Sequence, residues 1–449
     1  MEFSPEMFHG LNDQSAIIDE DHEYSYSNLS EDIRSFHRIL QNQVTSGSKV
    51  ALISVCSYHS IAWFFALTKN NNIVAPLIVS EDHSYREKLD EFRPDYLITV
   101  SSDNYSITKI QTDARHDSLI ETVTKHQHAG LVLFSSGTTG KPKAILHDLT
   151  NLIEHYQTKK PKHRIFLLYL LFDHIGGLNT IFKALFSGGC LVIPGKRNPE
   201  TVCRSIEQHR VQILPVTPGF LNLFLLGKMH KQFDLSSLLV ITYGTETMPL
   251  QLLITLRTTF PNIKFIQTFG TSETGIIQLR SFSGQSTAFS ITDPHVEYKI
   301  ENQELLIRNK FQFLGYLNNA VPLTDNAWYS TGDIVEEQEN GMLRIVGRKS
   351  DIINVGGQKV FPEEIEFVVR GFEFIKDCKA YGIQNTITGQ IVVCDIVISN
   401  QHPGTDAELK QSLRSHCVSQ LERYKVPVKF NIVEEIRRNA NLKIKRNIS

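Results

Sequence analysis

The most informative stretch of this sequence is Phe134-Ser135-Ser136-Gly137-Thr138-Thr139-Gly140-Lys141-Pro142-Lys143. It follows the apolar run 131–134, which predicts a buried strand, so the stretch should form a loop at the end of that strand. Its two glycines free the backbone to curl, and its hydroxyls, lysines and N–H groups can surround phosphate oxygens. The spacing is not that of a Walker loop, which would need glycine at 135 and a hydroxyl at 142. A plain turn is the alternative, but so many hydroxyl residues and glycines before two lysines favour a phosphate loop.

Apolar stretches alternate with amphipathic ones on both sides of this loop. Short buried strands are expected at 50–56, 96–100, 131–134, 165–171, 190–193, 213–216, 238–242 and 264–267. Helices are expected between several of them, for example at 199–209 and 250–260. Alternation of this kind predicts an α/β fold with βα units and largely parallel sheets.

The pattern changes after about residue 285, where strands expected at 296–300, 304–308 and 342–346 are separated by turns. This predicts a small β-rich subdomain at about 285–349. An α+β unit should follow, with helices at 362–369 and 406–421 and strands near 378–382 and 391–398. The chain is therefore expected to have a large N-terminal domain, 1–349, and a small C-terminal domain, 350–449.

Composition narrows the classes of function. The chain has 449 residues, of which 41% are hydrophobic and 21% charged, and a net charge of −2, which gives no sign of binding to nucleic acid. The longest apolar run, 165–172, is too short to span a bilayer, and the N-terminus has no signal-peptide pattern. The six cysteines show no CxxC spacing, which favours reduced thiols over a zinc site. We expect a cytoplasmic protein without a membrane span.

Four later segments contain residue types that suit a nucleotide site. They are Tyr243-Gly244-Thr245-Glu246-Thr247-Met248-Pro249, Thr268-Phe269-Gly270-Thr271-Ser272-Glu273-Thr274, Trp328-Tyr329-Ser330-Thr331-Gly332-Asp333 and the stretch 347–366, which begins Gly347-Arg348-Lys349-Ser350-Asp351. The carboxylate of Glu273 is the kind of ligand that Mg²⁺ prefers when it bridges phosphates. Asp333 is expected on a tight turn, where a carboxylate can accept hydrogen bonds from hydroxyl groups of a ligand.

Taken in order, the loop and these segments resemble the motifs of the adenylate-forming superfamily over roughly residues 10–446. This superfamily comprises acyl- and aryl-CoA synthetases, peptide-synthetase adenylation domains and firefly-type luciferases. The sequence departs from the family pattern at Ala144, where the family usually has glycine, and at Ser272, where it usually has threonine. It departs again at the hinge, where Ser350 replaces the more usual aspartate or lysine, and near the C-terminus, where Asn439 and Leu442 replace threonine and glycine. The resemblance implies a large N-terminal core and a small mobile C-terminal domain. It also implies ATP, Mg²⁺ and coenzyme A, or the phosphopantetheine of a carrier protein, as cofactors.

The resemblance assigns roles around the nucleotide. It implies phosphate binding by residues 135–141, with Gly244, Thr245 and Glu246 lining the adenine and Phe269 stacking on it. Gly270 is expected beside both nucleotide and acid, with Thr271 next to it, and the Ser272 hydroxyl near the α-phosphate. Glu273 is expected to hold Mg²⁺, Asp333 the ribose, and Arg348 another part of the nucleotide.

The segment Phe172-Asp173-His174-Ile175-Gly176-Gly177 resembles the family's acyl-pocket motif. In CoA ligases a histidine or aromatic residue there positions the substrate, a role that His174 would take. In amino-acid-activating members an aspartate near this point pairs with the substrate amine, a role that Asp173 would take. Because the two residues are adjacent, the alignment leaves both assignments open.

The C-terminal domain resembles the part of the family that divides catalysis into two steps. Ser350 matches the hinge, and Gly356 and Gly357 match glycines that let pantetheine pass. Lys443, within Arg438-Asn439-Ala440-Asn441-Leu442-Lys443-Ile444-Lys445-Arg446, matches the catalytic lysine, with Lys445 as a rival. A positive charge there would neutralise carboxylate and α-phosphate oxygens.

The expected activity is that of an ATP-dependent carboxylic acid:thiol ligase, in which Lys443, Glu273 and His174 are the catalytic residues. It would form an acyl-AMP and pyrophosphate, and then an acyl thioester, most simply with coenzyme A. One alternative is an amino-acid or acyl adenylating enzyme that loads a separate carrier protein. The other is a catalytically degenerate adenylate-binding protein. The expected partner is a small carboxylic acid, and its identity stays open.

Overall fold

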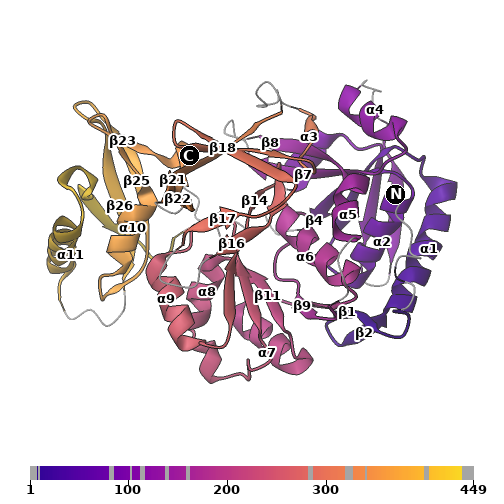
Figure 1. The fold of residues 1–449 in the computed structure, drawn as a ribbon, viewed down its shortest axis with the longest axis horizontal. Helices are drawn as coiled ribbons and strands as arrows, with labels where there is room; N and C mark the ends of the chain where they lie inside the picture. The colour runs from indigo at the N-terminus through magenta and orange to yellow at the C-terminus, as the bar shows by residue number, and fades with distance from the viewer. Residues whose placement is uncertain are drawn as a thin grey trace.

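The structure is a computed structural model that describes residues 8, 11–79, 85–101, 104–111, 117–136, 141–157, 162–281, 287–318, 327–338, 341–398 and 404–436. In these residues the strands form two seven-stranded sheets, a six-stranded sheet, a five-stranded sheet and a two-stranded hairpin. Figure 1 shows the two large sheets with their helices at the right and bottom, and the five-stranded sheet at the opposite end of the molecule. No helix in this described part of the chain has the length and apolar character needed to cross a membrane.

The first seven-stranded sheet contains the strand that leads into the phosphate loop. Its order is β20-β8-β7-β4-β3-β5-β6, and the central strands β7, β4, β3 and β5 are parallel. The strands are β3 (Lys49–Ser54), β4 (Ile73–Ile78), β5 (Tyr96–Val100), β6 (Tyr105–Lys109), β7 (Gly130–Ser136), β8 (Pro142–Asp148) and β20 (Gly315–Tyr316). The helices within this part of the chain are α1 (Tyr26–Gln43), α2 (Tyr58–Lys69), α3 (Tyr85–Phe92), α4 (Ser118–Lys125) and α5 (Leu149–Gln157).

The second seven-stranded sheet has the order β13-β12-β11-β9-β10-β1-β2 and is parallel except for the edge strand β2. Its strands are β1 (Ser15–Asp19), β2 (His22–Ser25), β9 (Ile165–Leu167), β10 (Cys190–Ile193), β11 (Ile213–Val216), β12 (Val240–Tyr243) and β13 (Lys264–Gln267). The helices that alternate with them are α6 (Ile175–Phe186), α7 (Pro199–His209), α8 (Pro218–Leu226) and α9 (Leu250–Thr259), with the short η2 (Met229–Lys231) after α8. The predicted α/β fold with largely parallel sheets is confirmed.

Helix α2 is apolar on almost every side and is buried accordingly. Ten of its twelve residues are buried, as expected for a helix enclosed by other elements rather than lying on a surface. One apolar core joins it to both large sheets, with members such as Val50 of β3 and Ile17 of β1. Trp63 of α2 stacks on Phe36 of α1 with ring centroids 4.5 Å apart. The two sheets therefore share a core, which fixes how their strand ends face each other.

One predicted strand is shorter than expected. The apolar run 165–171 predicts a single strand, but β9 ends at Leu167. Gly177, in the first turn of α6, lies so close to the backbone that an added Cβ would be 2.1 Å from the carbonyl oxygen of Leu171. The chain after Leu167 therefore leaves the sheet and packs under the start of α6. Hydrophobicity predicts burial there, but it does not distinguish a strand from a buried loop.

The β-rich part of the chain forms an antiparallel six-stranded sheet with the order β16-β17-β22-β21-β19-β18. Its strands are β16 (Leu279–Ser281), β17 (Phe289–Ile291), β18 (Val296–Glu301), β19 (Glu304–Asn309), β21 (Tyr329–Glu337) and β22 (Leu343–Arg348). The hairpin of β14 (Phe269–Thr271) and β15 (Gly275–Ile277) precedes it. This sheet starts slightly before residue 285 and ends at Arg348, next to the predicted domain boundary.

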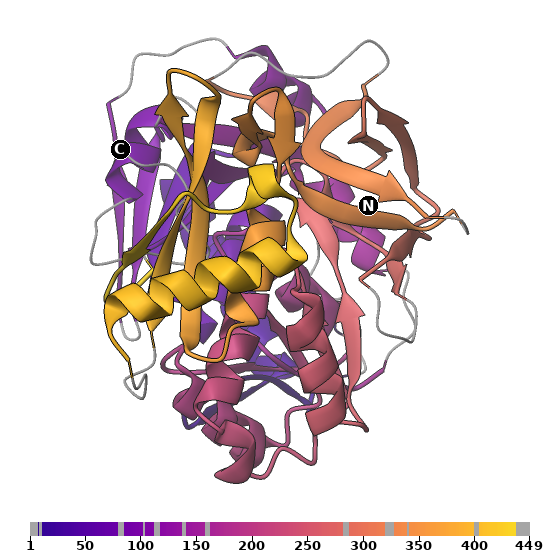
Figure 2. The same ribbon diagram turned by 90° about the vertical axis from the view of Figure 1, so that its left-hand side faces the viewer.

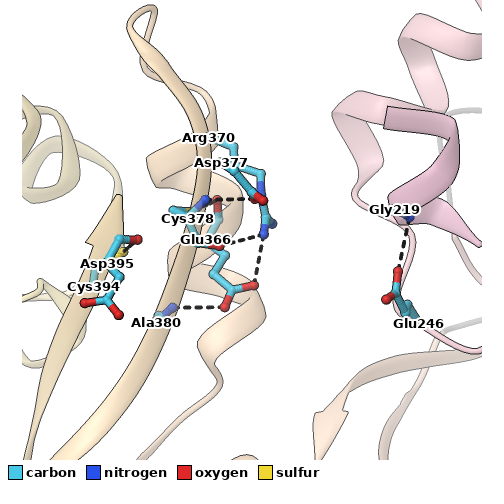
Figure 3. Close-up of polar contacts among 9 residues, drawn as sticks. All are labelled: Gly219, Glu246, Glu366, Arg370, Asp377, Cys378, Ala380, Cys394 and Asp395. Carbon is cyan, nitrogen blue, oxygen red and sulfur yellow. Dashed lines mark hydrogen bonds and ion pairs between the residues drawn. The ribbon is translucent and has the colours of Figure 1, made fainter. Parts of the chain in front are cut away.

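The C-terminal part of the chain has a sheet and an apolar core of its own. Its elements are η3 (Lys349–Asp351), β23 (Ile353–Val355), β24 (Gln358–Val360), α10 (Pro362–Arg370), β25 (Ile375–Asn385), β26 (Gly389–Ile398), α11 (Asp406–Gln420), η4 (Arg423–Lys425) and β27 (Lys429–Ile432). Figure 2 shows α11 on the face turned toward the viewer. Buried Glu366 joins α10 to β25, because it pairs with Arg370 and accepts a hydrogen bond from the Ala380 N–H (Figure 3).

Candidate active site

Three of the predicted nucleotide segments follow strand ends of the two large sheets: the phosphate loop follows β7, and the other two follow the adjacent strands β12 and β13. In parallel sheets, ligands bind outside the carboxyl ends of the strands. Ser135 and Ser136 end β7, and the segment after β12 lies beside the segment after β13. The Thr268 N–H donates to the carbonyl of Tyr243 at 2.8 Å, which extends the pairing of β12 and β13 into these two segments.

The segment after β12 contains Gly244, Thr245 and Glu246. A Cβ at Gly244 would lie 2.4 Å from the Thr268 hydroxyl oxygen, so glycine is needed for this close approach. Thr245 is exposed and has a φ of 69°, a conformation that is unfavourable for a β-branched residue. The Glu246 carboxylate accepts a hydrogen bond from the Gly219 N–H at the start of α8 (Figure 3; 3.1 Å). It thus anchors this segment to a helix N-terminus, where a negative charge is favoured.

The segment after β13 forms the tight β14–β15 hairpin. A Cβ at Gly270 would lie 2.1 Å from the carbonyl oxygen of Gly275 across the hairpin, so no other residue fits there. The Thr271 hydroxyl accepts hydrogen bonds from the N–H groups of Glu273 and Thr274, which fixes the turn. The ring of Phe269 lies 6.2 Å from that of Phe289 in the core of the six-stranded sheet and is 8% exposed. Stacking of Phe269 on adenine stays a prediction.

The carboxylate of Glu273 is buried, with 6% of the residue exposed, and is held by a residue that the sequence did not identify. Tyr316 donates a hydrogen bond from its hydroxyl to Glu273 Oε1 at 2.9 Å. Burial and the charge of Glu273 raise the pKa of Tyr316, so its hydroxyl remains a donor. The imidazole Nε2 of buried His147 donates to the carbonyl of the preceding residue, Ser272, at 2.6 Å.

Residues 313–318, named here the bridging segment, tie the strand after the phosphate loop to Glu273. The Phe313 N–H donates to the carbonyl of Glu273 at 2.8 Å, and Tyr316 pairs with Ile145 of β8. Asn318 accepts from the Ala144 N–H at 2.9 Å and donates to the carbonyl of Pro142 at 2.8 Å. These hydrogen bonds hold the residues after the phosphate loop and the Glu273 carboxylate in a fixed relative position.

Asp333 lies within strand β21 and not on the tight turn that the sequence predicted, because it pairs with Arg348 of β22. The two residues form an ion pair across these strands. Arg348 Nε lies 2.9 Å from Asp333 Oδ1, and the Asp333 side chain is 5% exposed whereas that of Arg348 is 45% exposed. The Asp333 N–H donates to the Thr331 hydroxyl, and an Arg348 Nη1–H donates to the Thr331 carbonyl. A buried carboxylate with a partly exposed guanidinium over it can bind a hydroxylated, negatively charged ligand.

Asp173 and His174 precede α6, and His174 occupies the N-cap position of this helix without a capping hydrogen bond from its side chain. Asp173 Oδ2 lies 3.1 Å from Lys88 Nζ of α3, and Asp173 Oδ1 lies 3.6 Å from His174 Nε2. The Asp173 side chain is 4% exposed. Lys88 comes from a helix 85 residues earlier in the chain, and no local spacing in the sequence pointed to this contact.

The predicted hinge and thiol-channel residues lie on the C-terminal side of β22. Ser350 is exposed within η3, and its hydroxyl donates to Asp351 Oδ1 at 2.8 Å. Gly356 and Gly357 form the turn between β23 and β24, with φ values of 57° and 84° that favour glycine. A Cβ at either glycine would meet no atom within 4 Å. Close packing by the described residues is therefore not the reason for glycine at these two positions.

Several predicted residues lie outside the described residues. They are Gly137, Thr138, Thr139 and Gly140 of the phosphate loop, and Lys443 with its rival Lys445. Lys141 is described: it is exposed, and its amine lies 3.7 Å from Glu91 of α3. The described residues fit the expected ligands. A single buried carboxylate with one oxygen fixed by Tyr316 suits a Mg²⁺ that takes its other ligands from water and phosphates. The Asp333–Arg348 pair suits a nucleotide.

The two-sheet core, the strand that leads into the phosphate loop and the buried carboxylates of Glu273 and Asp333 fit an enzyme that binds a nucleotide. The chain belongs to the AMP-binding enzyme family, whose model matches residues 8–317, and the model of the AMP-binding enzyme C-terminal domain matches residues 364–443. The chain is 25% identical to a 2-succinylbenzoate–CoA ligase of Bacillus pumilus, over 96% of this chain and 93% of that protein.

Two solved structures show the same fold. One is the anthranilate CoA ligase AuaEII in complex with anthranoyl-AMP, with a TM-score of 0.82 at 20% identity, covering 98% of this chain and 94% of that one. The other is ATP-bound MatB from Rhodopseudomonas palustris, with a TM-score of 0.80 at 17% identity, covering 98% and 97%. The predicted family and fold class are confirmed by these matches, including the division into a large N-terminal and a small C-terminal domain.

Proposed function

We propose that this protein activates a small carboxylic acid with ATP and transfers the acyl group to the thiol of coenzyme A. In the first step a carboxylate oxygen attacks the α-phosphorus of ATP, and pyrophosphate leaves. In the second step the thiolate attacks the acyl carbonyl, and AMP leaves. The second step is possible because AMP is a far better leaving group than oxide.

The observation that carries this proposal is the bridging segment. It holds the Glu273 carboxylate and the exit of the phosphate loop in a fixed relation through the hydrogen bonds of Phe313, Tyr316 and Asn318. Displacement at phosphorus depends mainly on positioning and on neutralisation of charge. When bound, Mg²⁺ would neutralise phosphate charge. Glu273 would hold it, while Asp333 and Arg348 would hold the nucleoside part.

Coenzyme A is favoured as the acceptor because the 2-succinylbenzoate–CoA ligase matches nearly the whole chain. Loading of a carrier protein with an amino acid is less well supported. In that alternative Asp173 would bind the ammonium group of the substrate, but its carboxylate already faces Lys88 and His174. A degenerate adenylate-binding protein is disfavoured because Glu273, Asp333 and Arg348 are present and paired with neighbours.

Acid-dependent exchange of pyrophosphate into ATP tests the first step, and thioester formation with added coenzyme A tests the second. A panel of aryl, alkyl, amino and dicarboxylic acids should contain at least one acid that supports both. Exchange without thioester formation would redirect the proposal to another acceptor. If no acid supports exchange above the background of a Glu273→Ala variant, the protein is not an adenylating enzyme.

A further inference from the structure

Helix α3 (Tyr85–Phe92) links the two halves of the candidate site, although no sequence motif marks it. Lys88 and Glu91 are three residues apart and so lie on the same side of the helix. Lys88 Nζ reaches Asp173 at 3.1 Å, and Glu91 accepts a hydrogen bond from Asn318 of the bridging segment at 2.8 Å. Lys88 Nζ also lies 6.0 Å from the centre of the Phe134 ring, directly before the phosphate loop. One helix face thus contacts both the acyl motif and the bridging segment.

The net charge beside His174 depends on Lys88, because the lysine amine pairs with the Asp173 carboxylate. The Asp173 side chain is 4% exposed and that of Lys88 is 17% exposed, so this is a largely buried pair rather than a solvated one. Removal of one member of such a pair leaves the other charge poorly solvated and without its partner. With both present, the pair contributes no net charge to the region where the resemblance places the acid.

We propose that Lys88 is a specificity-determining residue whose pairing with Asp173 selects acids that have no second charged group near the carboxylate. This inference rests on the proposed function. Because Asp173 pairs with Lys88, the Asp173 carboxylate is not available to bind an ammonium group and the Lys88 amine is not available to bind a second carboxylate. The preferred substrates are therefore uncharged aryl or alkyl acids, in contrast to amino acids and dicarboxylic acids.

The two single substitutions should shift the preference in opposite directions. Lys88→Met leaves the Asp173 carboxylate without its lysine partner and with His174 Nε2 at 3.6 Å as the remaining neighbour, so acids with an amino group should gain relative to uncharged acids. Asp173→Asn leaves Lys88 as an uncompensated cation, so dicarboxylic acids should gain. Each shift in the ratio of kcat/KM values should be on the order of tenfold, which is modest for unit charges separated by a few ångströms. The Lys88→Met/Asp173→Asn double variant has no charge of the pair and should return toward the wild-type ratio.

The experiment measures pyrophosphate exchange for three acids of similar size, one uncharged, one with an amino group and one with a second carboxylate. Some variants will have too little turnover for an exchange assay. For these, the shift in Tm on adding the matching non-hydrolysable acyl-adenylate analogue measures binding instead. Lys125→Met, which removes an exposed lysine beside Glu121 on α4, is the matched control and should leave all ratios unchanged.

Opposite shifts in the single variants and recovery in the double variant support the inference. Equal losses for all three acids, in exchange and in analogue binding, overturn it and leave Lys88 with a purely structural role. That result would leave the proposed function intact, because the wild-type protein would still catalyse exchange. Failure of the wild-type protein with every acid would overturn the proposed function and this inference with it.

Discussion

The hydroxyl of Tyr316 donates to Glu273 Oε1 at 2.9 Å, and both residues are at least 94% buried. The same ring lies 5.3 Å from Lys143 Nζ, just after the phosphate loop. Tyr316 therefore connects the carboxylate proposed for Mg²⁺ with a cation proposed for phosphate. One oxygen of Glu273 is directed by this hydrogen bond, so the carboxylate does not have to be ordered when the metal binds.

Replacement of Tyr316 by phenylalanine should weaken the use of Mg²⁺ without unfolding the protein. A hydrogen bond to a charged group contributes about 1.5–3 kcal/mol, so the Mg²⁺ concentration for half-maximal exchange should rise on the order of tenfold. The measurement is a Mg²⁺ titration of exchange, together with a Mg²⁺ titration of ATP binding by calorimetry.

Tyr156→Phe is the control for this variant. Tyr156 is also buried and also donates to a side chain, that of Asn179 at 3.0 Å, but it lies outside the nucleotide segments. It should change stability and leave the Mg²⁺ requirement alone. Identical Mg²⁺ titrations for Tyr316→Phe and wild type would show that Tyr316 has no part in positioning Glu273.

Asp333→Asn should weaken ATP binding because it removes the charge that pairs with Arg348 and is proposed to accept hydrogen bonds from the ribose. We expect a loss of about 2–3 kcal/mol, or on the order of 30- to 150-fold in Kd. Asp234→Asn is the matched control, since Asp234 pairs with Arg210 at 2.7 Å on the surface. Calorimetry of ATP binding would contradict the assignment if both variants bound ATP like the wild type.

The residues that sequence analysis identified differ in a physical way from those that it missed. The strand before the phosphate loop and helix α7 (Pro199–His209) depend on local patterns and were predicted closely. Lys88 and Tyr316 owe their roles to contacts with residues 85 and 43 positions away, which no local spacing reveals. The end of β9 was wrong for a similar reason, because it depends on the close approach of Gly177.

Acidification should destabilise the protein through His147. Burial lowers the pKa of this imidazole below its ordinary value of 6.5. The unfolded state therefore binds more protons than the folded state at pH values just below 6.5, and stability falls as pH falls through this range. Thermal unfolding between pH 8 and 5 should show a decline that is smaller in His147→Gln. His126→Gln, at an exposed position, is the control and should leave the fall in Tm with pH as large as in the wild type. If Tm falls with pH as steeply in His147→Gln as in the wild type, His147 is not the source of the pH dependence.

Arg370→Met should destabilise the C-terminal domain. It leaves the Glu366 carboxylate, 3% exposed, without its ion-pair partner, which typically costs about 3–5 kcal/mol. Arg204→Met is the control because Arg204 and Glu200 have the same i,i+4 spacing in α7, with side chains that are 62% and 65% exposed. It should cost less than about 1 kcal/mol. The comparison uses urea unfolding of the full chain, and similar midpoints for the two variants would contradict a structural role for the buried pair.

The last prediction separates the two chemical steps. Lys443→Ala should lose acyl-adenylate formation, by on the order of a few hundred-fold for one lost charge contact, and should still transfer an acyl group from a synthetic acyl-adenylate to coenzyme A. Gly357→Leu should form the adenylate and fail to transfer it, because the side chain would occupy the space proposed for pantetheine.

Gly341→Leu is the matched control for the glycine variant. Gly341 also has a positive φ, 71°, with open space around its Cβ position. It lies at the end of the β21–β22 hairpin, remote from Asp333 and Arg348. It carries the same backbone strain without blocking the thiol, so both half-reactions should survive. Loss of the same half-reaction in Lys443→Ala and Gly357→Leu would exclude a division of labour within the C-terminal domain, whereas an active Lys443→Ala beside an inactive Lys445→Ala would only move the catalytic lysine by two residues.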